Sequence, residues 1–111
     1  EKIQKKAADA GFDWRDVSGA LDKLDEETGE LRQAVETGGD VAGELGDVLF
    51  AAVKVGRFCG IDPEDAIAGT CEKFIRRFRV MEQEAARQGR ALRDMTLEEM
   101  TALWNGAKER S

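Results

Sequence analysis

Residues 21–50 read LDKLDEETGELRQAVETGGDVAGELGDVLF, and this stretch decides the fold. It holds two acidic pairs with a spacing of three, Glu27 with Glu30 and Glu44 with Asp47. Residues three apart share one face of a helix, so each pair aims two carboxylates at one spot. Two glycines, Gly38 and Gly39, lie between the pairs and can reverse the chain. The stretch therefore predicts two facing helices with four carboxylates converging between them.

The four carboxylates form an all-oxygen set, which is the kind of site that hard divalent cations prefer. We expect Glu27 and Glu30 to be partly buried beside the apolar stripe of their helix, and Glu26 to be more exposed. Carboxylates held close together repel one another unless a cation binds between them. The first pair alone could be a solvated acidic face, but the second pair lies in a helix with few other charges. The pattern favours a site for Mg²⁺, which Mn²⁺ could replace.

Length and composition predict one all-α domain over residues 1–111. Hydrophobic residues make up 41% of the chain, enough for a modest core. Charged residues make up 36% and there is a single proline, which favours helices with solvated faces over a sandwich or barrel. The net charge of −6 argues against sequence-independent binding of nucleic acid.

The chain has no histidine and two cysteines, Cys59 and Cys71. This composition excludes histidine-based acid–base catalysis and argues against a zinc site. The cysteines are expected to be reduced thiols. The longest apolar run, residues 48–53, is too short to span a bilayer, so we expect a cytoplasmic protein without a membrane partner.

Apolar residues recur at spacings of three and four, which predicts a bundle of four main helices after a short charged lead-in over residues 1–10. The four run from Trp14 to Gly38, from an Asp40 N-cap towards Gly60, from Pro63 to near Gly89, and from a Thr96 capping box through Ala107. Between Leu45 and Cys59 only three residues carry charge, Asp47, Lys54 and Arg57. We therefore expect the second helix to be central and buried.

Cations and an aromatic residue follow on the last two helices. Lys73 and Arg77 are four apart and share a face, as do Trp104 and Lys108. Such cations near a carboxylate-bound metal would complete a polyphosphate site. Taken singly, each lysine or arginine could simply solvate its helix, and Trp104 could be a core residue.

Five segments, in order along nearly the whole chain, resemble a MazG-type nucleoside triphosphate pyrophosphohydrolase of the all-α class. They are GFDW at residues 11–14, KLDEETGEL at 23–31, ELGDVLF at 44–50, EKFIRRFR at 72–79 and LWNGAK at 103–108. The second and third carry EExxE and ExxD patterns that related all-α pyrophosphatases share, including dimeric dUTPases. The last two segments resemble the C-terminal MazG domain more narrowly.

The resemblance implies hydrolysis of a nucleoside triphosphate to a monophosphate and pyrophosphate with Mg²⁺, as nucleotide-pool housekeeping. The metal ligands would be Glu27, Glu30, Glu44 and Asp47. Catalytic roles would fall to Glu26, which would orient or deprotonate the attacking water, and to Glu27, Lys73 and Arg77. The substrate would be bound by Lys23, Lys73, Arg77, Trp104 and Lys108. Family members pair through helices, so a homodimer or dimer-based assembly is also implied.

The chain departs from the family pattern in two respects. Cys71 stands where the family usually has Asn, although it could simply pack as a small apolar residue. Many bacterial MazG proteins carry two such domains, so this chain is either an excised domain or a single-domain relative. These departures motivate an alternative to the enzyme, a catalytically weak nucleotide-binding or interaction module of the same fold. A purely structural bundle is a third reading.

Overall fold

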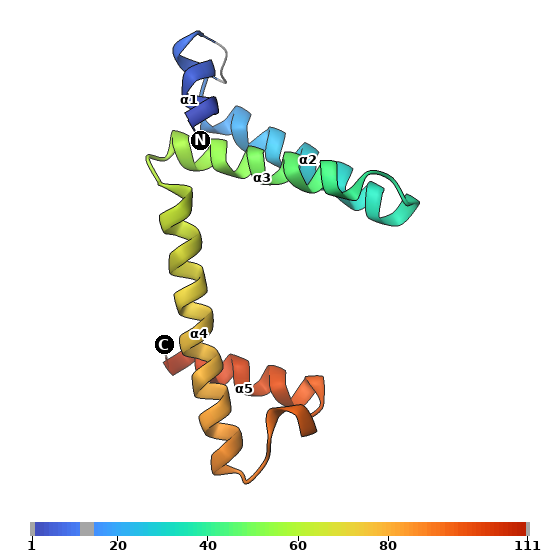
Figure 1. Cartoon of the computed structure of the whole chain (residues 1–111), viewed down its shortest axis with the longest axis vertical. Coiled ribbons are helices and arrows are strands. Elements are labelled where there is room, and N and C mark those ends of the chain that lie inside the picture. The colour runs from blue at the N-terminus through green and yellow to red at the C-terminus, as the bar shows by residue number, and fades with distance from the viewer. Residues whose placement is uncertain (1, 12–14, 111) are drawn as a thin grey trace. The chain divides into compact units, whose positions relative to one another are not determined.

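Five α-helices and one 3₁₀ turn make up the computed structural model, which describes residues 2–11 and 15–110 (Figure 1). They are α1 (Lys2–Asp9), α2 (Val17–Thr37), α3 (Val41–Phe58), α4 (Pro63–Arg87), η1 (Leu92–Asp94) and α5 (Leu97–Arg110). No strand occurs among these described residues, so the predicted all-α class is confirmed. The chain divides into two compact units, Glu1–Pro63 and Glu64–Ser111, and each is described by itself.

The first unit is built on an antiparallel hairpin of α2 and α3, whose turn is specified by its capping residues. Gly38 takes the left-handed conformation at φ 74°, and its N–H and that of Gly39 both reach the carbonyl of Ala34. Glycine adopts this conformation without the steric cost that a Cβ imposes. Asp40 then accepts a hydrogen bond from the N–H of Gly43 at 3.0 Å, as an N-cap of α3. The predicted chain reversal and the Asp40 cap are both confirmed.

Small residues let α2 and α3 approach each other closely. Ala20 and Ala34 on α2 and Ala51 on α3 are all buried. The hairpin also contacts α1, because the buried side chain of Gln4 donates a hydrogen bond from Nε2 to the carbonyl of Phe50 at 2.7 Å. The helical lead-in expected near the N-terminus is therefore present and attached to α3.

The expectation that the second main helix is buried is wrong for the described residues of the first unit. Ala51 is the one buried residue of α3 among those described, while Leu45, Leu49 and Phe50 are about half exposed. Among the described residues, α2 packs along α3 and α1 contacts it at Phe50, so part of the surface of α3 stays uncovered within this unit. The near absence of charge on α3 thus leaves an apolar surface on the first unit.

The second unit joins α4 to α5 through η1. Thr96 and Glu99 form the predicted capping box, because Glu99 N–H donates to Thr96 Oγ1 and Thr96 N–H donates to Glu99 Oε1. Arg90 stabilises the connection between α4 and α5, because it pairs with Glu99 and donates a hydrogen bond to the carbonyl of Asp94. Among the residues described in this unit, Met81, Ala85, Met95 and Ala107 are buried.

The predicted helix boundaries agree closely with the observed ones. Helix α4 begins at Pro63 and ends at Arg87, near the predicted Gly89. Helix α2 begins at Val17 behind an Asp16 N-cap, whereas the predicted start at Trp14 lies outside the described residues, as do Phe12 and Asp13. Every helix among the described residues is too short or too polar to cross a membrane.

Candidate metal and phosphate site

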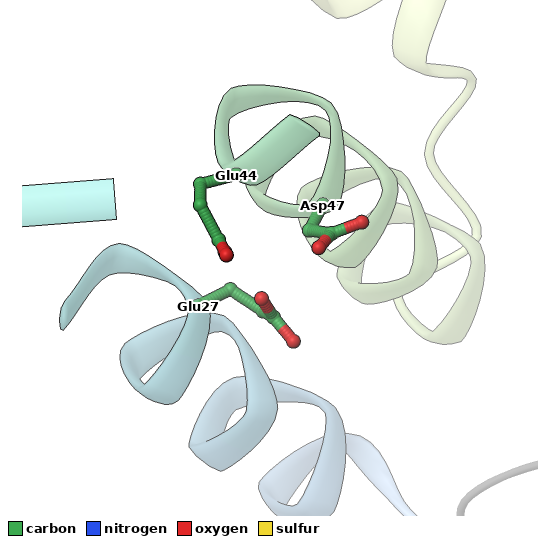
Figure 2. A group of neighbouring side chains, drawn as sticks. All are labelled: Glu27, Glu44 and Asp47. Carbon is green, nitrogen blue, oxygen red and sulfur yellow. The ribbon is translucent and has the colours of Figure 1, made fainter. Parts of the chain in front are cut away.

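Three carboxylates from the two arms of the hairpin meet at one point. Glu27 on α2 faces Glu44 and Asp47 on α3 (Figure 2), and one carboxylate oxygen from each lies within 4.8 Å of the others. The antiparallel hairpin produces this meeting, because residues before the turn come to lie beside residues after it. Oxygens at this spacing can share one cation.

Burial differs among the three side chains. Glu27 is buried, Glu44 is half-buried and Asp47 is exposed. One oxygen of Glu27 and one of Glu44 (Oε2 in each) are shielded from solvent without a hydrogen-bond partner in the described part of the chain. Buried carboxylate oxygens without partners are costly, and a cation bound between them would satisfy both atoms.

Glu30 is exposed, so the expectation that it would be partly buried is wrong. Residues three apart on a helix differ by about 60° in direction, and Glu27 is the member of the pair that faces α3. The charges of the carboxylate cluster nevertheless affect the pKa of Glu30. The negative charge of Glu27, followed by desolvation and the charge of Glu44, raises the pKa of Glu30 above its ordinary value.

Lys23 is the counter-ion of the adjacent glutamates Glu26 and Glu27. Its Nζ lies 3.0 Å from Oε1 of Glu27 and 3.5 Å from Oε1 of Glu26. The hydrogen bond to Glu27, with the charges of both glutamates, raises the pKa of Lys23. Glu26 is the more exposed of the two glutamates, as expected from the sequence. Lys23 and Glu26 are therefore adjacent to the carboxylate cluster.

A pocket of about 260 Å³ opens beside the cluster, within the first unit. Its lining consists of Lys23, Glu27, Asp47, Phe50, Ala51 and Lys54. The pocket thus combines carboxylates that can hold a cation with ammonium groups that can hold an anion.

The remaining predicted site residues lie in the second unit, on α4 and α5. Trp104 is half-buried there; its ring lies 5.2 Å from the ring of Phe74 and 5.7 Å from the guanidinium carbon of Arg77. Lys73 and Lys108 are exposed on the same two helices. Arg77 and Trp104 are therefore brought together by tertiary packing, which their separation in the sequence does not show.

Two residues of the first unit were not predicted to contribute to the site or its support. Lys54 was noted only as one of the few charges of its helix, yet it lines the pocket. Gln4 was not singled out at all, although it is only 1% exposed and bonded to α3. For Lys54, its position within an otherwise largely apolar helix could have indicated a place in the site. Nothing in the local sequence marks Gln4, because its burial depends on where α1 docks.

Comparison with known proteins agrees with the resemblance in the sequence. The family described as the MazG nucleotide pyrophosphohydrolase domain matches residues 7–80. The chain is 36% identical over 107 residues to the nucleoside triphosphate pyrophosphohydrolase/pyrophosphatase MazG of Thermotoga maritima, covering 96% of this chain and 42% of that protein. It is 39% identical over 112 residues to the nucleoside triphosphate pyrophosphohydrolase of Escherichia coli, covering 97% and 43%. Uncharacterised protein YabN of Bacillus subtilis is 53% identical over 66 residues, or 60% of this chain and 14% of YabN. The chain therefore spans less than half the length of these relatives.

Proposed function

Because the chain belongs to the MazG nucleotide pyrophosphohydrolase domain family, we propose that it hydrolyses nucleoside triphosphates to a nucleoside monophosphate and pyrophosphate. The observation that carries this proposal is the meeting of Glu27, Glu44 and Asp47 oxygens within 4.8 Å. We propose the cytoplasm as its compartment and nucleotide-pool housekeeping as its role.

The carboxylate set fits a hard divalent cation. All the donors are oxygens, which suits Mg²⁺ or Mn²⁺ better than a soft metal. The unpartnered buried oxygens of Glu27 and Glu44 are what a cation would satisfy. These two residues and Asp47 would hold the ion, with Glu30 as a fourth ligand. When bound, the ion supplies positive charge that stabilises the phosphate oxygens as the bond breaks.

Glu26 is the proposed general base. Its side chain is 56% exposed, so water can reach it, and the ion pair with Lys23 at 3.5 Å holds it beside Glu27. In the proposed reaction, the water oxygen attacks the α-phosphorus while Glu26 accepts a proton. The bond from that phosphorus to the α–β bridging oxygen breaks, and its electron pair leaves with pyrophosphate.

The cations of the second unit are proposed to bind substrate. Lys73, Arg77 and Lys108 carry positive charge that can pair with triphosphate oxygens. Trp104 offers an aromatic face for the nucleoside and is held by Phe74 and Arg77. These roles rest on the family resemblance together with the packing of Trp104.

We propose that the chain forms a homodimer through the apolar face of α4. Ile67, Phe74 and Phe78 are 62%, 56% and 40% exposed and, with Cys71, follow the alternating spacing of four and three of a helix–helix seam. Exposed apolar patches of this kind usually mark protein interfaces. Cys71 fits such a seam as a small apolar residue.

The dimer is tested by sedimentation equilibrium of the wild type, Ile67→Glu and Arg76→Gln. We expect Ile67→Glu to shift the protein to monomer, because it buries a charge in the seam. Arg76 lies nine residues further on, about half a turn away from Ile67 in direction, so its substitution should leave the dimer intact. A monomeric wild type would reject the proposal.

The activity is tested by incubation with several ribonucleoside and deoxyribonucleoside triphosphates and Mg²⁺, with chromatography of the products. We expect monophosphate and pyrophosphate, and we expect both to disappear in Glu44→Ala but to persist in Glu36→Gln, an exposed carboxylate on α2. Release of orthophosphate and diphosphate would refute the assigned bond. Nucleotide binding without any product would instead support the binding-module alternative.

A further inference from the structure

The lining of the pocket in the first unit carries charges of both signs. Lys23 precedes Gly39 by about 16 residues on α2 and Lys54 follows it by about 15 on α3. At 1.5 Å per residue, both lysines lie roughly 23 Å along their helices from the turn. Glu27 and Asp47 are closer to the turn along their helices, so the two lysines enter the lining from the side away from the turn, which we call the ammonium end. The Nζ atom of Lys23 reaches back from there to 3.0 Å from Oε1 of Glu27.

Lys54 shares a helical face with the metal-site residue Asp47. The two are seven residues apart, which is close to two full turns and places both side chains on one side of α3. Lys54 is half-buried and lines the pocket, whereas a lysine that only solvates its helix would extend into solvent. Its position therefore directs a positive charge to the site.

Lys23 alone supplies limited charge to an anion. Its ammonium already contacts two glutamates, at 3.0 and 3.5 Å. A phosphate chain carries more than one negative charge, so a second cation adds both charge and hydrogen-bond donors at this end of the pocket. Lys54 is the second cation that the described residues bring to the lining, and like Lys23 it has an interaction of its own within the chain.

The backbone that carries Lys54 is supported from α1. Gln4 donates to the carbonyl of Phe50 at 2.7 Å, and this carbonyl is the one that the helical pattern pairs with the N–H of Lys54. Since Gln4 is only 1% exposed, the contact holds this turn of α3 against α1. Gln4 thus contacts the same turn of α3 that carries Lys54.

We propose that Lys54 binds the phosphate chain of a metal-bound di- or triphosphate in this pocket, together with Lys23. The inference rests on the proposed function and adds a substrate-binding residue that the family resemblance does not assign. The pocket volume of about 260 Å³ is below the roughly 300–1,000 Å³ of sites that enclose a whole drug-sized ligand. It therefore suits the phosphate chain, with the nucleoside lying outside it.

Isothermal titration calorimetry on the full chain tests the proposal, with Mg²⁺ alone and with Mg²⁺ plus inorganic pyrophosphate as ligands. We expect Lys54→Gln to weaken pyrophosphate binding about tenfold, the effect of losing one charged hydrogen bond. Binding of Mg²⁺ alone should be unchanged or tighter, because a positive charge near the carboxylates is removed. Lys54→Arg should retain most of the pyrophosphate affinity.

Arg32→Gln is the matched control, since Arg32 is an exposed cation on α2 that lines a different surface hollow. It should bind both ligands as the wild type does. If Lys54→Gln does not fold by circular dichroism, Lys54→Met removes the charge while keeping the apolar stem. Pyrophosphate affinity equal to the wild type, equal losses for Mg²⁺ and pyrophosphate, or no pyrophosphate binding by any form would each overturn the inference.

The proposed function can fail separately from this inference. Lys54-dependent binding of pyrophosphate without cleavage of any nucleoside triphosphate would overturn the function alone. Normal cleavage with Lys54-independent binding of pyrophosphate would overturn the inference alone.

Discussion

Lys23 and Glu27, one turn apart on α2, form an ion pair of 3.0 Å in which the carboxylate side chain is 9% exposed and the ammonium side chain 37%. The pair connects the group that can bind a cation with one that can bind an anion, because Glu27 belongs to the carboxylate cluster and Lys23 is a lysine of the pocket lining. In the absence of a metal, Lys23 is a positive charge bound directly to Glu27. The ion pair therefore stabilises the carboxylate cluster before any ligand arrives.

Removal of Lys23 should destabilise the metal-free protein more than the metal-bound one. Lys23→Met leaves the buried carboxylate of Glu27 without its counter-ion, which Mg²⁺ would partly replace. We expect thermal unfolding of Lys23→Met to occur at lower temperature than wild type in EDTA, with a smaller difference in Mg²⁺. Arg32→Met, on an exposed part of α2, should show no such dependence. If the difference in unfolding temperature between Lys23→Met and the wild type were the same in EDTA and in Mg²⁺, the cation would not replace Lys23 as the counter-ion of Glu27.

Mg²⁺ should stabilise the folded chain. A ligand present at one hundred times its dissociation constant raises the free energy of unfolding by about 2.7 kcal/mol. Urea unfolding with and without Mg²⁺ should show a gain of this order in the wild type and none in the Glu27→Gln, Glu44→Gln double variant. The double variant without Mg²⁺ should be at least as stable as the wild type, because two like charges are gone. If Mg²⁺ raised the free energy of unfolding equally in both proteins, the cation would not bind at Glu27 and Glu44.

The capping box of α5 should make stability depend on pH. Arg90 and the N–H of Thr96 lower the pKa of Glu99 from 4.5 to about 2. A carboxyl whose pKa is lowered by folding stabilises the folded state above its unfolded pKa, and this contribution is lost as pH falls from about 4.5 to about 2. Unfolding measured between pH 6 and pH 2 should therefore lose less stability in Glu99→Gln than in wild type. Glu98→Gln, its exposed neighbour, should follow the wild-type profile.

The N-cap of α3 should matter for metal binding as well as for stability. Asp40→Ala removes the bond to Gly43 and should cost about 1 kcal/mol of stability. Glu44 lies in the first turn that this cap holds, so Mg²⁺ affinity should fall as well. Asp40→Asn keeps a capping oxygen and should restore both properties. Calorimetric titration with Mg²⁺ and urea unfolding measure the two properties. Unchanged Mg²⁺ affinity in Asp40→Ala would show that the N-cap does not contribute to metal binding.

Trp104 should affect nucleotide recognition without affecting the metal. Trp104→Phe keeps an aromatic ring against Phe74 and should retain the fold while raising KM for the nucleoside triphosphate. Lys108→Gln should raise KM as well, because it removes a proposed phosphate contact. Mg²⁺ affinity measured by calorimetry should be unchanged in both variants. If KM were unchanged in both variants, these two residues would not belong to the substrate site.

Much of the fold and part of the candidate site could be predicted from local sequence. The turn at Gly38, the cap at Asp40 and the box at Thr96 were all predictable, because each depends on a few adjacent residues. The convergence of Glu27 with Glu44 was also expected, because a tight turn fixes the register of an antiparallel pair. The burial of Glu30 and of α3 was predicted wrongly, since burial depends on which neighbours actually cover each face.

The sequence by itself determined the all-α class, most of the helix ends, and Glu27, Glu44 and Asp47 as neighbours across one turn, since helical periodicity and capping are properties of short segments. Only the tertiary structure decided that Glu27 is the buried member of its pair, that Gln4 supports α3, and that Lys54 shares a pocket with Lys23. These three features depend on contacts between segments distant in sequence. Such contacts are set by how helices dock and rotate against one another, and no local pattern encodes that rotation.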